Sequence, residues 1–165
     1  MAARALEFTI FTAARTGETI GARWSELDLT AATWTVPANR MKTGKLHRVP
    51  LSDAALALLT KLAVAHIAAP DNHVFPGATK GQPLSNMSML MLLRRMQIEG
   101  PTPHGMRSSF RDWAGEETDF PREVAEAALA HTFGSEVERA YRRGDALAKR
   151  REMMADWGEF LSTSP

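Results

Sequence analysis

The sequence predicts a mainly α-helical fold with a small antiparallel β-sheet, an α+β class. Most of the chain consists of stretches with helical apolar spacing, separated by short segments rich in proline, glycine or asparagine. One region near Trp34 has strand character, and a glycine-containing turn at residues 42–45 follows it. With 165 residues, 44% of them apolar and 24% charged, the chain has the size and composition of one soluble globular domain.

The N-terminal part of the chain predicts two helices followed by a hairpin. Residues 2–14 look helical, and Thr16 with Gly17 interrupts the pattern before a short second helix that runs towards Leu27. Three strands are expected next, over residues 33–36, 40–41 and 47–49. Because the turn at residues 42–45 joins the last two, the sequence predicts an antiparallel sheet with a basic hairpin tip.

Helices are expected over most of the remaining chain. Ser52 is a good N-cap for a helix whose leucines, up to Leu62, form an apolar face. Residues 70–83 are expected to form a loop, after which Ser85 can cap a helix that contains Leu93. Further helices are expected over residues 104–117, from Pro121 to near His131, and over residues 136–142 and 145–161. No repeat or long linker divides the chain, so residues 1–165 are expected to form one domain.

Composition excludes several classes of protein. Cysteine is absent, so the chain has no disulfide framework. The longest run rich in alanine and leucine, residues 54–69, is interrupted by Lys61 and His66 and is too short for a membrane span. The N-terminus lacks the pattern of a signal peptide, so we expect a cytoplasmic protein without membrane contact. The five histidines lack the spacings of metal sites, and no glycine-rich phosphate loop occurs, so we expect neither metal nor cofactor.

Positive charge is distributed unevenly along the chain. The net charge of +1 is smaller than that of a typical nucleic-acid-binding domain. Several basic residues nevertheless gather in two clusters, which are Arg40, Lys42, Lys45, His47 and Arg48, and Arg139, Arg142, Arg143, Lys149, Arg150 and Arg151. Each cluster is either an ordinary solvated face or a surface that binds an anionic partner.

The one tyrosine of the chain, Tyr141, lies ten residues after His131 and downstream of the pair His104 and Arg107. A phenol that follows imidazole and guanidinium groups in this way is placed as a nucleophile would be if the target were a phosphate. Each feature alone also has an ordinary explanation. A tyrosine on a helix is usually a half-buried core residue, and a pair at three-residue spacing often serves surface hydrogen bonding.

Six motifs occur in one order along the chain. They are Ala-Arg-Thr-Gly-Glu with Arg15 and Glu18, Lys42-Thr43-Gly44, Arg48-Val49-Pro50-Leu51-Ser52, His104-Gly105-Met106-Arg107, Ala-Leu-Ala-His ending at His131, and Glu-Arg-Ala-Tyr ending at Tyr141. This order resembles the catalytic domain of the tyrosine recombinases, also called phage integrases, across nearly the whole chain. The resemblance implies that family's catalytic-domain fold and site-specific DNA recombination, in integration or excision.

The resemblance also implies a role for each residue of the motifs. Tyr141 would attack the scissile phosphate and form a 3′-phosphotyrosyl link to DNA. Arg15 and Arg107 would hold the phosphate oxygens, since a guanidinium offers a planar fork of donors that stays protonated. Arg23 is the alternative to Arg15 for the first of these positions. His104 would be the general base or its orienting partner.

The remaining motif residues would assist these groups. Lys42 would protonate the leaving 5′-oxygen, with Lys45 as the alternative. His131 would donate a hydrogen bond to the phosphate, and Glu18 would orient Arg15. Contacts with DNA are implied for Arg40, Lys45, Arg48, Arg142 and Arg143.

Integrases of this kind carry DNA-binding domains ahead of the catalytic one, whereas this chain begins close to the first catalytic helix. We therefore expect a catalytic-domain fragment of a longer integrase. Its expected partners are double-stranded DNA and further recombinase protomers, in a tetrameric synapse. The terminal helix, residues 145–161, either docks on a neighbouring protomer or packs on its own domain. Two other functions stay open, which are a DNA-binding module without cleavage and a nicking and closing enzyme like the type IB topoisomerases.

Overall fold

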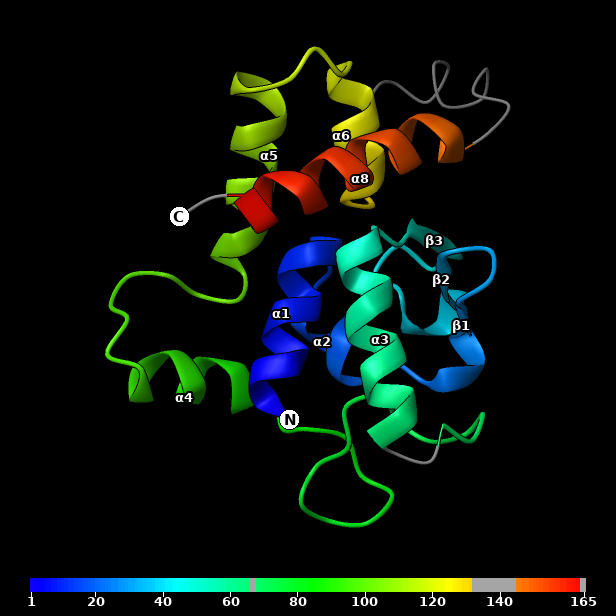
Figure 1. Ribbon diagram of the computed structural model, residues 1–165, viewed down its shortest axis with the longest axis vertical. Coiled ribbons are helices and arrows are strands. Elements are labelled where there is room, and N and C mark those ends of the chain that lie inside the picture. The colour runs from blue at the N-terminus through cyan, green and yellow to red at the C-terminus, as the bar shows by residue number, and fades with distance from the viewer. Residues whose placement is uncertain (66–67, 132–144, 164–165) are drawn as a thin grey trace.

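A computed structural model describes residues 1–65, 68–131 and 145–163 of the chain. Helices form most of these ranges, and three short strands form one antiparallel sheet, so the predicted fold class is confirmed (Figure 1). The elements are α1 (Ala2–Thr12), α2 (Thr16–Ile20), η1 (Trp24–Glu26), β1 (Leu27–Asp28), β2 (Thr33–Val36), η2 (Ala38–Arg40), β3 (His47–Pro50), α3 (Asp53–Ala65), α4 (Ser88–Arg95), α5 (Gly105–Glu116), α6 (Arg122–Ala128) and α8 (Leu147–Thr163), where η marks a short 3₁₀ helix.

The sheet has the order β1-β2-β3, with both pairs antiparallel. In its register Trp34 pairs with Val49, and both side chains are buried. This register turns the apolar face of the sheet towards α1, where Phe8 and Trp34 have ring centroids 5.2 Å apart. The hairpin between β2 and β3 is therefore fixed to the main core, and its basic tip extends from that core.

The predicted strand at residues 40–41 is wrong, because Ala38–Arg40 forms a 3₁₀ helix. Pro37 ends β2, since it has no N–H to donate to the sheet, and the Arg40 N–H closes the turn on the Pro37 carbonyl at 3.0 Å. The Arg40 guanidinium then binds the Glu26 carboxylate and the Glu18 carbonyl. The strand that completes the sheet is instead β1, Leu27–Asp28, which the sequence pattern does not predict.

The second helix ends at Ile20, well before Leu27. Gly21 follows it and is packed against the Arg40 side chain, so closely that a Cβ at this position would lie 2.7 Å from a guanidinium nitrogen. Gly21 is needed here because it lets Arg40 reach the carbonyls of α2.

Two apolar clusters form the core, and α1 contacts both. The larger cluster lies between α1, α3 and the sheet and includes Phe8, Trp34 and Phe75. The second lies between α5, α6 and α8, and includes Phe110 and Trp157. In Figure 1, α8 runs across the molecule with α5 and α6 on one side and α1, α3 and the sheet on the other.

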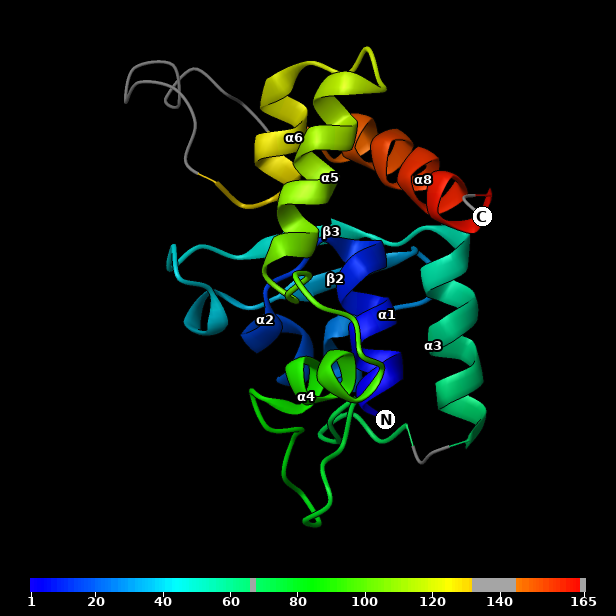
Figure 2. The same ribbon diagram turned by 90° about the vertical axis from the view of Figure 1, so that its left-hand side faces the viewer.

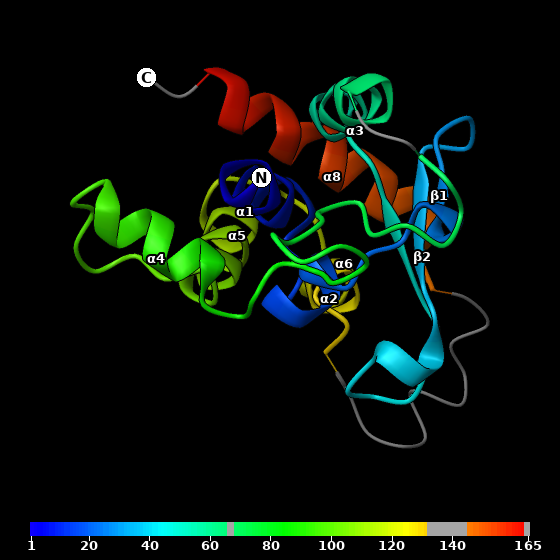
Figure 3. The same ribbon diagram turned by 90° about the horizontal axis from the view of Figure 1, so that it is seen from below.

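Helix α4 lies beside α1 at the end of the molecule remote from α6 (Figure 2). Seen from below, α4 and the sheet lie on opposite sides of α1 (Figure 3). The helix begins at Ser88, and Ser85, the expected cap, has its Oγ 3.2 Å from the Oγ of Ser88. The Ser52 hydroxyl does accept the N–H of Ala55 at 3.4 Å, as expected for an N-cap.

Helix α8 packs on its own domain, which answers the question left open by the sequence. It lies against α1, α3, α6 and β3. Trp157 is 3% exposed, and its indole N–H donates to the Ile10 carbonyl at 2.8 Å. Gly158 lies against Ser52, where a Cβ would come within 2.7 Å of the Ser52 hydroxyl oxygen. The predicted helix at residues 136–142 lies outside the described residues. None of the described helices combines the length and apolar character needed to cross a membrane.

Candidate active site

Arg15 and Arg107 come from segments remote in the sequence and meet at the C-terminal end of α6. Arg15 follows α1 and caps α2, whereas Arg107 lies in the first turn of α5. Both donate to the carbonyl oxygen of Leu129, Arg107 at 2.6 Å and Arg15 at 3.5 Å. Arg107 also donates to the Ala13 carbonyl. Cations are favoured at this place, because the last carbonyls of a helix carry partial negative charge.

The two guanidinium groups repel each other, and the surrounding charges only partly offset this. Arg107 is 5% exposed, and burial, together with the charge of Arg15, lowers its pKa to about 10, against the attraction of Glu18. Among the described residues, the hydrogen-bond partners of Arg107 are two carbonyl oxygens and a histidine nitrogen, which carry no negative charge. An anion between the two arginines would therefore be strongly attracted.

Glu18 holds Arg15 in place. Its carboxylate accepts the Arg15 backbone N–H at 2.9 Å through Oε2 and the guanidinium at 2.8 Å through Oε1. This reciprocal cap starts α2, and Glu18 is 5% exposed. The contact fixes the direction of the Arg15 side chain, and the part of Glu18 in catalysis stays a prediction.

His131 lies beside Arg107, on the segment that leaves α6. Its backbone N–H donates to the Glu126 carbonyl at 2.9 Å. Its ring Nε2 lies 3.2 Å from a guanidinium nitrogen of Arg107, and its Nδ1 lies 2.8 Å from the Glu126 carboxylate. Because a guanidinium only donates, Nε2 must accept, and the ring proton is therefore on Nδ1, from which it is donated to Glu126.

Glu126 is not among the residues that the sequence predicts for the site. It is five residues before His131, a spacing that does not place two side chains on one face of a regular helix. The two meet because the chain leaves α6 through Ala130, whose φ of 50° lies in the left-handed region. Neither glycine nor asparagine marks that turn in the sequence, so the sequence does not predict the contact.

His47 is a second residue that the sequence did not assign to the site. It begins β3, and its Nε2 lies 3.2 Å from the Ala128 carbonyl, next to the carbonyl shared by the arginines. Burial, with the charges of Arg150 and Arg107 added to it, lowers the pKa of His47 to about 4 against the pull of Glu18. The neutral ring therefore donates to Ala128 and ties the sheet to the end of α6.

Among the described residues, the other predicted site residues form no side-chain hydrogen bond with Arg15 or Arg107, and the rest lie outside the described residues. His104 is exposed, and its carbonyl accepts the Arg107 N–H at 3.2 Å, so it is one turn away along the backbone. Lys42 and Lys45 are exposed on the hairpin around Gly44, whose φ is 65°. The choice between the two lysines stays open. The described residues do not include Tyr141, Arg142 and Arg143.

Two of the arginines expected on DNA make internal contacts. Arg40 binds Glu26 and the end of α2, and its side chain is 20% exposed. Arg48 forms a two-pronged pair with Asp145, with both N–O distances 2.9 Å, and its side chain is 45% exposed. These pairs hold the hairpin to η1 and to the segment before α8, and contacts of either arginine with DNA stay a prediction. Among the described residues, no three histidine, aspartate or glutamate side chains gather as metal ligands would.

Comparison with known proteins places the chain in a family. Residues 2–147 match the family described as the phage integrase family. The chain is 39% identical over 157 residues to the prophage integrase IntA of Escherichia coli K12, covering 94% of this chain and 37% of that protein. It is 34% identical over 154 residues to the integrase of Shigella phage Sf6, covering 92% of this chain and 39% of that protein.

A third relative, the prophage integrase IntS of Escherichia coli K12, is 34% identical over 154 residues, covering 92% of this chain and 39% of that protein. The chain thus spans well under half the length of these curated relatives. No solved structure matches the chain. The match over residues 2–147 includes every residue predicted for the site, from Arg15 to Arg143, and the chain belongs to the phage integrase family.

Proposed function

We propose that this chain is the catalytic domain of a longer site-specific recombinase, which cuts and rejoins DNA through a covalent link to Tyr141. The observation that carries the proposal is the meeting of Arg15 and Arg107 at the Leu129 carbonyl. Two guanidinium groups from distant segments, with one of them almost buried, form the kind of preorganised donor set that a phosphodiester requires in its transition state.

The reaction would run in two balanced steps. In the first, the Tyr141 oxygen attacks phosphorus, the bond from phosphorus to the 5′-oxygen breaks, and a 3′-phosphotyrosyl link forms. His104 takes the phenolic proton, and Lys42 or Lys45 gives one to the leaving 5′-oxygen. In the second, the 5′-hydroxyl of another strand attacks phosphorus and gives its proton back to the lysine, the bond from phosphorus to the Tyr141 oxygen breaks, and His104 returns a proton to that oxygen. Because one phosphodiester is exchanged for another, no nucleotide cofactor is consumed.

Each assignment fits the chemistry of the residue that bears it. A free phenol has a pKa of about 10, so little phenolate exists at neutral pH and a base has to remove the proton. The guanidinium groups balance the charge that grows on the non-bridging oxygens, where one lost donor costs about 3 kcal/mol. His131 lies against Arg107, which supports a hydrogen bond from its ring to the same phosphate.

The partners follow from the same chemistry. The substrate would be double-stranded DNA, with further protomers in a tetrameric synapse, and the protein would work in the cytoplasm with no metal or cofactor. Its relatives are named as integrases of prophages and of a phage, which supports integration or excision as the outcome.

The test is covalent capture on nicked duplexes. A pool of duplexes with a randomised core and a nick, which lets the short cleaved piece diffuse away, is incubated with the wild-type chain and with the Tyr141→Phe variant. We expect an adduct that resists detergent with the wild type and none with the variant. An adduct that persists in Tyr141→Phe, or reversible binding with no adduct in the wild type, would overturn the proposal, and the second result would favour a DNA-binding module. A supercoiled plasmid that carries the captured sequence extends the test. Relaxation of this plasmid without recombinant products would indicate a nicking and closing enzyme.

A further inference from the structure

We propose that Glu126 is a positioning residue for catalysis, which sets the orientation and the proton of His131 next to Arg107. This inference rests on the proposed function, because His131 would act on the phosphate that Tyr141 attacks. The residue belongs to α6, and no motif of the sequence includes it.

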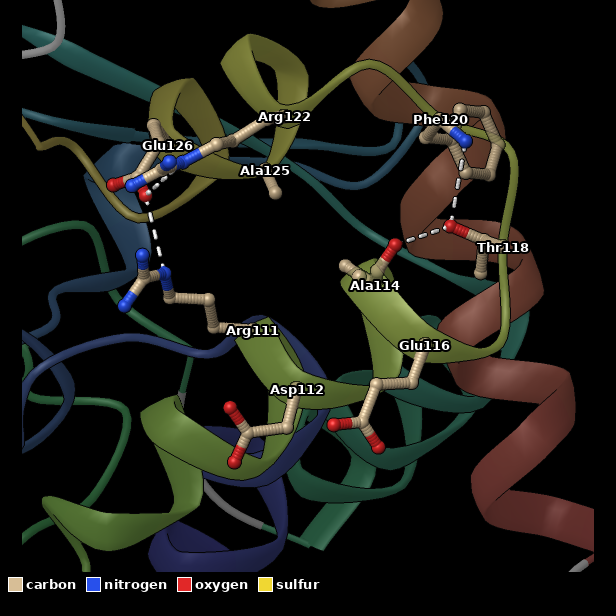
Figure 4. A pocket seen from close by; sticks show the side chains of 10 residues that line it. Arg111, Asp112, Ala114, Glu116, Thr118, Phe120, Arg122, Ala125 and Glu126 are labelled. Atoms are coloured by element: carbon tan, nitrogen blue, oxygen red, sulfur yellow. Dashed lines mark hydrogen bonds and ion pairs between the residues drawn. The ribbon is translucent and has the colours of Figure 1, made fainter.

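The Glu126 carboxylate is held from three sides. Its Oε2 lies 2.8 Å from Nδ1 of His131. Its Oε1 lies 3.1 Å from Nε of Arg111 and 3.7 Å from Nε of Arg122. Figure 4 shows Arg111, from α5, and Arg122, from α6, both reaching the carboxylate at one side of a cavity of about 520 Å³. The side chain of Glu126 is only 8% exposed, so these three partners and the surrounding protein, rather than water, set the position of the carboxylate.

The charge on Glu126 is maintained by its neighbours. Burial alone would raise the pKa of the carboxyl, but the hydrogen bond from His131 and the charges of Arg111 and Arg122 lower it overall. Glu126 is therefore ionised at neutral pH and can only accept hydrogen bonds. An acceptor at Nδ1 requires a proton there, and this leaves Nε2 facing Arg107.

This arrangement decides what His131 can offer to a phosphate. Without a substrate, Nε2 accepts an N–H of Arg107. When a phosphate oxygen takes over that N–H, Nε2 can donate to the phosphate only if the ring holds a second proton. The positive ring would then lie between the phosphate and the Glu126 carboxylate, which balances its charge. Glu126 thus acts through His131 and does not touch the reacting atoms.

The network also links two helices that carry site residues. Arg111 lies four residues after Arg107 on α5, so it is on the same side of that helix, one turn further along. Its ion pair with Glu126 joins α5 to α6, as does the hydrogen bond from Arg107 to the Leu129 carbonyl one turn earlier on α5. An amide at position 126 would keep the shape of the side chain but lose the charge that both arginines and the ring require.

The experiment compares Glu126→Gln with Glu123→Gln, a matched variant at an exposed position of the same helix. We expect Glu126→Gln to slow formation of the adduct on the nicked duplex pool by about 10-fold to 100-fold. An effect of this size is typical when the carboxylate that orients a metal-binding histidine is removed, and Glu126 holds His131 in the same way. DNA affinity and the thermal midpoint should stay within the range of Glu123→Gln.

A second readout reports the ring itself and does not depend on catalysis. Nitrogen-15 spectra of the histidine side chains, assigned with His131→Gln, show which ring nitrogen carries the proton. We expect the proton on Nδ1 of His131 in the wild type and in Glu123→Gln, and a shifted Nδ1 signal in Glu126→Gln and Glu126→Ala, where the charged acceptor of that proton is gone.

The outcomes separate this inference from the proposed function. Unchanged ring signals and an unchanged rate of adduct formation in Glu126→Gln would overturn the role of Glu126, while loss of the adduct in Tyr141→Phe would still support the recombinase. Altered ring signals with an unchanged rate would restrict Glu126 to a structural part and would equally overturn the inference. If the wild type forms no adduct, the proposed function fails, whatever the spectra show.

Discussion

At the scale of single residues, the site depends on side chains that hold positive charge out of water. Arg107 is 5% exposed, yet the pKa of about 10 that burial produces still leaves it charged at neutral pH. His47 is the opposite case, because burial next to Arg150 and Arg107 keeps its ring neutral. Both bind carbonyls at the end of α6, so one helix end orders a cation and a neutral imidazole.

The state of His47 makes stability depend on pH. Because its pKa is lowered from 6.5 to about 4, the unfolded chain takes up a proton before the folded one as the pH falls. The contribution of the neutral ring is complete above pH 6.5 and is lost between that value and about 4. At about 1.4 kcal/mol for each pH unit, the loss is about 3 kcal/mol.

Urea unfolding of the wild type and of His47→Gln over this pH range measures that contribution. We expect the free energy of unfolding to fall more steeply for the wild type than for His47→Gln, whose amide can still donate to Ala128. His104→Gln, at an exposed position, serves as the control and should follow the wild type. Parallel curves for the wild type and His47→Gln would contradict the assignment of a neutral ring.

At the scale of elements, the helices could be predicted where local signals mark their ends, and the sheet could not be predicted fully. Ser52 and Pro121 mark helix starts within one residue of those observed. The strand expected at residues 40–41 failed because Pro37 ends β2 and residues 38–40 form a 3₁₀ helix, in which Arg40 binds Glu26 on η1, a contact that local composition does not reveal. The same limit hid Glu126, which reaches His131 only through the left-handed turn at Ala130.

Helix α8 offers a test of how one element is held in place. Trp157 lies among Phe110, Trp113 and Phe160, with ring centroids 5.0 to 5.6 Å away, and donates to the Ile10 carbonyl. We expect Trp157→Ala to cost about 3–5 kcal/mol of unfolding free energy, since it empties a buried aromatic site. Trp157→Phe keeps most of that packing and should cost about 1 kcal/mol, the worth of the lost hydrogen bond.

Chemical denaturation of the two Trp157 variants checks these values, with Glu152→Ala, at an exposed position of the same helix, as the control that should leave the free energy of unfolding unchanged. A cost near zero for Trp157→Ala would mean that α8 is not docked on its own domain in solution. The prediction concerns α8 alone, so it holds whether or not the chain cuts DNA.

At the scale of the whole molecule, the candidate site lies where the two apolar clusters meet. Arg15 follows α1, which contacts both clusters, whereas Arg107 is on α5 and His131 follows α6, two helices of the second cluster. The order of motifs predicts the members of the site, because each motif is local. Their distances could not be predicted, because they depend on how α5 and α6 pack against α1 and α8.

The central claim, that Tyr141 becomes joined to DNA beside these arginines, is tested most directly by identifying the amino acid in the covalent adduct. The adduct formed by the wild-type chain on the nicked duplex pool is digested with protease and nuclease and analysed by mass spectrometry. We predict one modified peptide, which contains Tyr141 and carries a nucleotide through its 3′-phosphate. A nucleotide attached to a serine, threonine or histidine, or attached through a 5′-phosphate, would contradict the account.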